Sequence, residues 1–225
     1  MTNPRTARPF PRRAVAPRAI LCRAGGGTLV VVAPHPDDET LGAGSLIAAA
    51  VRAGIRVAVV ALTDGGASHT SVRWPPAALG RLRRGELRRA LARLGAGRAA
   101  VRHLGWPDGG VDHAGRALAL RAVLTALAPA IVIAASPADH HPDHRAGWRL
   151  TVAALAGTRV PLIAYAVWSR AGGGRAAHGP IAAKLWAARA HRSQTSGYIA
   201  DDPDGFRLTP ALLRTFVRGA EAFAR

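Results

Sequence analysis

Five mostly apolar stretches alternate along the chain with segments whose apolar residues recur at helical spacing. The apolar stretches cover residues 28–33, 55–62, 99–104, 130–135 and 162–168. Runs of consecutive apolar residues are typical of strands that are buried on both faces of a parallel sheet. The predicted helices cover residues 43–53, 77–94, 116–127, 145–155, 180–191 and 210–223. This alternation predicts an α/β fold, a doubly wound and mostly parallel sheet with helices on both faces.

The length of 225 residues suits one domain with a sizeable core. Residues 1–24 are basic and contain four prolines, so we expect a flexible basic N-terminal arm, followed by one domain over residues 25–225. The single cysteine, Cys22, excludes an intramolecular disulfide and is typical of a reducing compartment. No apolar run is long enough for a membrane span or a signal peptide, so we expect a cytoplasmic protein.

The formal net charge of +18 raises the alternative of a non-catalytic protein that binds nucleic acid or an anionic surface. The basic residues are almost all arginines spread along the helices, with Lys184 the only lysine. No zinc-finger or RNA-recognition motif accompanies them. We therefore expect no nucleic-acid partner, and keep this class as the alternative to an enzyme.

A polar cluster follows the first predicted strand. Two prolines end this strand, and His35, Asp37, Asp38 and Glu39 come directly before the first predicted helix of the domain. The simplest interpretation is a helix cap, with one of the aspartates at the N-cap. Capping explains one carboxylate, however, and leaves His35 and the other acids without a role.

A second polar cluster follows the fourth predicted strand. It reads Asp139-His140-His141-Pro142-Asp143-His144 and precedes another predicted helix. Because the loops that follow parallel strands emerge at one edge of the sheet, both clusters can converge there although about a hundred residues separate them.

The spacing of the two clusters predicts a catalytic metal site. His35, Asp38 and His144 offer three nitrogen and oxygen ligands, which is the pattern of a catalytic Zn²⁺ with an open fourth position. Asp37 suits the general base that activates water, and His141 suits the acid or the oxyanion donor. Asp143 is expected to hold the imidazole of His141 protonated. We expect Glu39 to support the site from behind and His140 to be a solvated bystander.

These motifs resemble those of the PIG-L (LmbE-like) family of metal-dependent de-N-acetylases. The resemblance rests on Val32-Ala33-Pro34-His35-Pro36-Asp37-Asp38-Glu39 and on His141-Pro142-Asp143-His144. Weaker matches run in family order from about residue 28 to 200: Thr63-Asp64-Gly65, Arg83 with Glu86, Leu104 to Gly109, and Lys184 with His191 to Gln194. Some family members carry a tyrosine where this chain has Asp139.

The resemblance implies a Rossmann-like three-layer fold and a Zn²⁺ or Fe²⁺ centre at His35, Asp38 and His144. It implies the same roles for Asp37 and His141, and places Arg83 and Asp108 near a sugar. The implied reaction is hydrolysis of the acetamide of an N-acetylglucosamine-type substrate, a small molecule, glycoconjugate or glycolipid precursor. An amidase that cleaves larger acyl groups at the same site is the alternative within the enzyme class.

Overall fold

The computed structural model describes residues 14–112, 116–169 and 181–225. Its six-stranded sheet has the order β3-β2-β1-β4-β5-β6. The first five strands are parallel, and β6 pairs antiparallel with β5. The strands are β1 (Thr28–Ala33), β2 (Arg56–Thr63), β3 (Ala100–Trp106), β4 (Pro129–Ala135), β5 (Leu162–Tyr165) and β6 (Phe223–Ala224). The predicted α/β fold with a mostly parallel sheet is confirmed.

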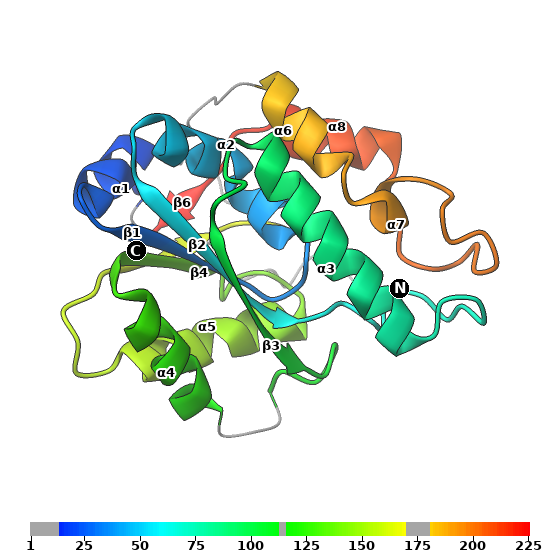
Figure 1. Ribbon diagram of the computed structural model, residues 1–225, viewed down its shortest axis with the longest axis horizontal. Helices are drawn as coiled ribbons and strands as arrows, with labels where there is room; N and C mark the ends of the chain where they lie inside the picture. The colour runs from blue at the N-terminus through cyan, green and yellow to red at the C-terminus, as the bar shows by residue number, and fades with distance from the viewer. Residues whose placement is uncertain (1–13, 113–115, 170–180) are drawn as a thin grey trace.

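Helices cover both faces of this sheet (Figure 1). One face carries α1 (Pro17–Ala24), α2 (Asp38–Arg52), α3 (Pro76–Arg93), α6 (Ile181–Ala188) and α8 (Pro210–Arg218), and the other carries α4 (Ala117–Leu127) and α5 (Pro142–Leu155). A short turn, α7 (Arg192–Thr195), follows α6. Along β1, Leu29 and Val31 pack into the first layer, while Val30 and Val32 pack into the second. A strand with two buried faces needs apolar residues at every position, which is why its sequence is continuously apolar.

The C-terminal part differs from the prediction in two places. The fifth strand ends at Tyr165 rather than residue 168, because the backbone N–H groups of the next residues turn toward the carboxylate of Asp139. The last helix ends at Arg218 rather than residue 223, and the chain after Gly219 becomes extended to form β6. A two-residue strand leaves almost no sequence pattern, so β6 was not predicted.

The expectation of a flexible arm over residues 1–24 is wrong for the part that the structure describes. Residues 17–24 form α1, in which Ile20 and Ala24 are fully buried. The backbone N–H of Val15 also donates to the carbonyl of Phe223 at 2.8 Å. Pro17 stands in the first turn of α1, where a missing N–H breaks no helical hydrogen bond. Residues 1–13 lie outside the described part of the chain.

The connections of the sheet define where its loops gather. β1 and β4 are neighbours, but the chain continues from β1 to β2 on one side and from β4 to β5 on the other. The carboxyl ends of β1 and β4 therefore flank a topological switch point, where α/β proteins place their ligand sites. Among the residues described, no helix is long and apolar enough to cross a membrane.

Candidate metal centre

The two polar clusters meet at this switch point. α2 begins at Asp38, five residues earlier than predicted, and α5 begins at Pro142. Asp37 occupies the N-cap position of α2, but its side chain makes no capping hydrogen bond. Helix capping therefore does not account for the first cluster.

The three predicted metal ligands lie next to one another and are buried. Asp38 Oδ2 is 3.2 Å from His35 Nδ1 and 3.2 Å from His144 Nε2. Zinc–ligand bonds of 2.0–2.2 Å at tetrahedral angles place neighbouring ligand atoms about 3.4 Å apart. These two distances fit neighbouring ligands of one metal ion. In the described part of the chain, the sets of metal-type side chains whose ligand atoms all lie within 4.8 Å of one another are His35, His141 and His144, and His35, Asp108 and Asp143, so Asp38 belongs to neither set.

The chemistry of the donors fits a cation as well. Among the described residues, no hydrogen-bond partner satisfies the buried Nε2 of His144. Burial works to lower the pKa of His144, but the carboxylates of Asp38 and Asp139 outweigh it and raise the pKa to about 9. The pKa of His35 is likewise raised well above its ordinary value, because carboxylates around it outweigh the effect of burial. The cluster thus stabilises positive charge where a metal would sit.

Asp139 holds His144 and was not predicted to belong to the site. This fully buried carboxylate accepts a hydrogen bond from His144 Nδ1 at 2.8 Å. It also accepts the backbone N–H groups of Val167, Trp168 and Ser169 at 3.3, 3.2 and 2.6 Å. A proton on Nδ1 leaves the lone pair of Nε2 free for a metal, as is common for metal-binding histidines. A carboxylate five residues before a predicted ligand was the only signal in the sequence.

Arg83 holds the predicted general base, Asp37. Its guanidinium donates to Asp37 Oδ2 at 3.1 Å, to the carbonyl of Pro36 at 2.9 Å and to the carbonyl of Gly65 at 2.8 Å. The carboxylate of Glu39 accepts the backbone N–H of Asp37 at 3.1 Å. These contacts fix Asp37 at φ 145°, a conformation that costs a non-glycine residue about 1–3 kcal/mol. The supporting position expected for Glu39 is confirmed.

Burial gives Asp37 the character of a base. Burial raises the pKa of Asp37, the charge of Arg83 opposes it, and the resulting pKa is about 6. At neutral pH such a carboxylate is ionised, yet it is more basic than an exposed aspartate.

The predicted partnership between Asp143 and His141 is wrong. The carboxylate of Asp143 lies 3.1 Å from His35 Nε2 and accepts the backbone N–H groups of Gly109 and Val111. In the part of the chain that the structure describes, no carboxylate forms an ion pair with His141. The backbone N–H of Asp143 instead donates to His141 Nδ1 at 3.2 Å. As the second residue of α5, Asp143 points its side chain away from the imidazole before the helix.

His141 is therefore neutral. Burial, followed by the nearby charges of His35 and His144, lowers the pKa of His141 to about 4. Because Nδ1 accepts a hydrogen bond, the single ring proton belongs on Nε2. His140 is exposed, as expected for a bystander.

The site opens into a cavity of about 250 Å³. His35, Asp37, Asp38 and His141 line it together with Ala67, Ser68, Arg83, Asp108, Trp168, Gln194 and Phe206. Asp108 Oδ1 lies 3.1 Å from His35 Nε2, and its other oxygen accepts the N–H of Ala67. Burial works to raise the pKa of Asp108, but the imidazole of His35 outweighs it and lowers the pKa to about 2. Both residues expected near a sugar, Arg83 and Asp108, thus reach the cavity.

The family model of GlcNAc-PI de-N-acetylase (PIG-L) matches residues 30–155, more than half of the chain. The chain belongs to the PIG-L family. The match covers the two strands that lead into the clusters and both clusters themselves. The predicted family is therefore confirmed.

This PIG-L chain is also similar to curated relatives. It is 35% identical over 170 residues to a 1D-myo-inositol 2-acetamido-2-deoxy-α-D-glucopyranoside deacetylase of Mycolicibacterium vanbaalenii, covering 63% of this chain and 59% of that protein. The chain thus spans less than two thirds of the length of the curated relatives it matches.

Two solved structures share the fold. The conserved protein TT1542 from Thermus thermophilus is 32% identical with a TM-score of 0.62, covering 74% of this chain and 79% of that one. The N,N′-diacetylchitobiose deacetylase from Pyrococcus horikoshii has a TM-score of 0.72 at 23% identity, covering 88% and 82% of the two chains, and supports the fold alone.

Proposed function

We propose that this PIG-L chain is a metal-dependent N-deacetylase that hydrolyses the acetamide of an N-acetylated amino sugar. The observation that carries the proposal is the pair of 3.2 Å distances that join Asp38 Oδ2 to His35 Nδ1 and to His144 Nε2. The family supports the reaction, and the activity for which the curated relatives are named supports an N-acetylglucosaminyl group as the substrate class.

His35, Asp38 and His144 would hold the metal, and two histidines with one carboxylate suit Zn²⁺ or Fe²⁺. When bound, the metal supplies a Lewis acid that acidifies water and polarises the acetamide carbonyl. The metal assignment and the roles below are parts of the proposal.

Asp37 acts as the general base. Its carboxylate accepts a proton from the attacking water as the C–O bond forms, while Arg83 keeps it at a fixed position beside the cavity. When the C–N bond breaks, Asp37 returns this proton to the leaving nitrogen, which gives acetate and a free amine. A pKa of about 6 suits both steps near neutral pH.

His141 stabilises the developing oxyanion as a neutral hydrogen-bond donor. Its Nε2–H is available because its Nδ1 accepts the N–H of Asp143. The structure therefore favours the oxyanion donor over a protonated acid. Asp143 orients His35 and the loop at Gly109 rather than His141, and Asp108 stays the candidate to hydrogen-bond a sugar hydroxyl.

Acetate release tests this proposal. Zinc-loaded protein is assayed on N-acetylglucosaminyl-inositol, N,N′-diacetylchitobiose and simple N-acetylglucosaminides, and we expect release from at least one of them. Asp37→Ala is expected to abolish release while the protein still binds zinc, with Asp112→Ala, an exposed carboxylate, as the matched control. Full activity in Asp37→Ala would refute the assignment of the base.

The two alternatives make different predictions. An amidase for larger acyl groups would release hexanoate faster than acetate from matched substrates. A basic nucleic-acid binder would bind oligonucleotides in a way that weakens steeply with salt and survives His35→Ala. We expect no such oligonucleotide binding; the absence of a nucleic-acid partner and the cytoplasmic location stay predictions.

A further inference from the structure

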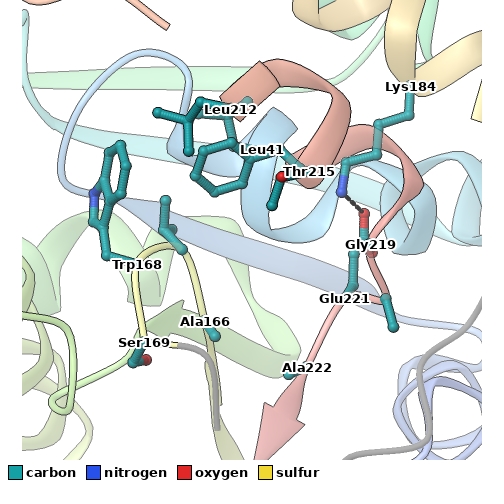
Figure 2. A pocket seen from close by; sticks show the side chains of 13 residues that line it. Leu41, Ala166, Trp168, Ser169, Lys184, Leu212, Thr215, Gly219, Glu221 and Ala222 are labelled. Carbon is teal, nitrogen blue, oxygen red and sulfur yellow. Dashed lines mark hydrogen bonds and ion pairs between the residues drawn. The ribbon is translucent and has the colours of Figure 1, made fainter. Parts of the chain in front are cut away.

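A second cavity, of about 280 Å³, is shown in Figure 2, and it shares Trp168 with the catalytic cavity. Its walls come from α2, α6, α8, the segment after β5 and the segment before β6. Leu41, Leu212, Phe216 and Trp168 give it a largely apolar lining, and Lys184 and Glu221 lie together at one end. None of the roles proposed above uses this cavity.

The charges at its end are already paired. Lys184 Nζ donates to Glu221 Oε1 at 2.7 Å, and both side chains are almost fully buried. The carboxylate of Glu221 also accepts the backbone N–H groups of Ser45 and Leu46 at 2.6 and 3.0 Å. An anionic ligand would have to break this pair, so the cavity favours an uncharged, apolar occupant.

Trp168 separates the second cavity from the catalytic cavity. It lines both of them. Its ring packs edge-on against Phe206, on the catalytic side, at 5.9 Å between centroids, and against Phe216, on the other side, at 5.3 Å. Its backbone N–H is fixed to Asp139, the residue that holds His144. The two cavities therefore adjoin at this indole.

We infer that the second cavity binds an apolar chain carried by the substrate, an inference that rests on the proposed deacetylase function. An engineered cavity of about 150 Å³ lined by apolar residues binds benzene, so the larger volume here accommodates a hydrocarbon chain. Such a chain belongs either to the N-acyl group or to the aglycone of the sugar. The chemistry of recognition is the same for both, and burial of each methylene tightens binding about fourfold.

The test is calorimetric binding to zinc-loaded Asp37→Ala protein, which leaves the amide intact. The reference ligand is methyl N-acetylglucosaminide. One arm replaces its methyl aglycone by hexyl, and the other replaces its acetyl group by hexanoyl. We expect at least one arm to bind ten times more tightly than the reference or better, and the arm that does so identifies the source of the chain.

Substitutions in the cavity test whether the gain in affinity for a long-chain ligand arises there. Leu212→Trp and Thr215→Phe fill it from α8 and are expected to lose most of the gain. Leu118→Trp, the same change at an exposed position of α4, is expected to keep it. Thermal melting shows whether each variant is folded. One folded filling variant is enough to compare the gain in affinity with that of the control.

Equal affinity for the reference and both long ligands would overturn the inference, as would an undiminished gain in a folded filling variant. The proposed function fails separately, if wild-type protein releases no acetate from the short substrates.

Discussion

Replacing Asp139 by asparagine tests how the metal ligand His144 is held. One oxygen of Asp139 accepts His144 Nδ1 and the N–H of Val167, and the other accepts the N–H groups of Trp168 and Ser169. Asparagine has one acceptor oxygen and one NH₂ group. In either orientation of the amide, the NH₂ group therefore faces two N–H donors that a carboxylate oxygen accepts in the wild type. Where it faces His144, the proton of that imidazole moves to Nε2, and the lone pair for the metal is lost.

The expected effect follows from the bonds that are lost. A hydrogen bond to a charged group contributes about 1.5–3 kcal/mol, which corresponds to roughly a tenfold to hundredfold change in an equilibrium constant. Changes to the partners of metal-binding histidines cost metal affinity by the same factor of about 10–100. We therefore expect Asp139→Asn to bind Zn²⁺ about 10–100 times more weakly.

Competition with a fluorescent zinc chelator measures this affinity without reference to activity. Asp112→Asn is the matched control, because Asp112 is exposed and pairs with the exposed Arg149. The control is expected to bind zinc like the wild type. A folded Asp139→Asn protein whose zinc affinity stays within about threefold of the wild type would refute the role of Asp139.

Four further substitutions probe the base, the packing of α2 and the buried ion pair. Arg83→Lys is expected to lower kcat roughly tenfold with little change in KM, because a lysine cannot hold the carboxylate of Asp37 and two carbonyls together. A change in KM alone would contradict this role and indicate that Arg83 contacts the substrate. Gly42→Ala places a methyl group 2.4 Å from a buried tyrosine ring and should lower the free energy of unfolding by about 1–3 kcal/mol. Gly44→Ala, whose nearest neighbour is 3.4 Å away, should change it by less than about 1 kcal/mol, so equal urea curves for the two would contradict this account. Lys184→Met leaves the carboxylate of Glu221 buried without a cation and should lower the free energy of unfolding, measured by urea denaturation, by about 3–5 kcal/mol. A stability close to that of the wild type would contradict this prediction.

The central strands of the fold were predictable because burial on two faces leaves a strong pattern. β1 has the predicted bounds, residues 28–33, since every one of its side chains is buried. The extended pairing of Phe223 with Tyr165 and the packing of the helix at Pro17 against β4 depend on contacts between segments far apart in the sequence. Local periodicity carries no information about such contacts, so both were missed.

The sequence was enough to predict which residues gather in the candidate site, because they follow neighbouring strands. It was not enough to predict which hydrogen bonds their side chains form. The position of His35, Asp38 and His144 after neighbouring parallel strands was enough to expect them together. Which imidazole Asp143 or Asp139 contacts depends on the start of α5 and on the turn after β5, and neither is encoded in ligand spacing. Arg83 was expected near the sugar and does line the cavity, but its hydrogen bonds to Asp37 and to the carbonyls of Pro36 and Gly65 were not predicted.

The most direct test of the proposed metal centre is a titration of acetate release with zinc. Chelator-stripped protein receives increasing Zn²⁺ in the presence of an N-acetylglucosaminyl substrate, and the rate is compared with that of Asp38→Asn. We predict that the rate rises from zero to a plateau near one zinc per chain, and that Asp38→Asn stays inactive over the same range. Undiminished acetate release by the stripped protein, or by Asp38→Asn, would contradict the account.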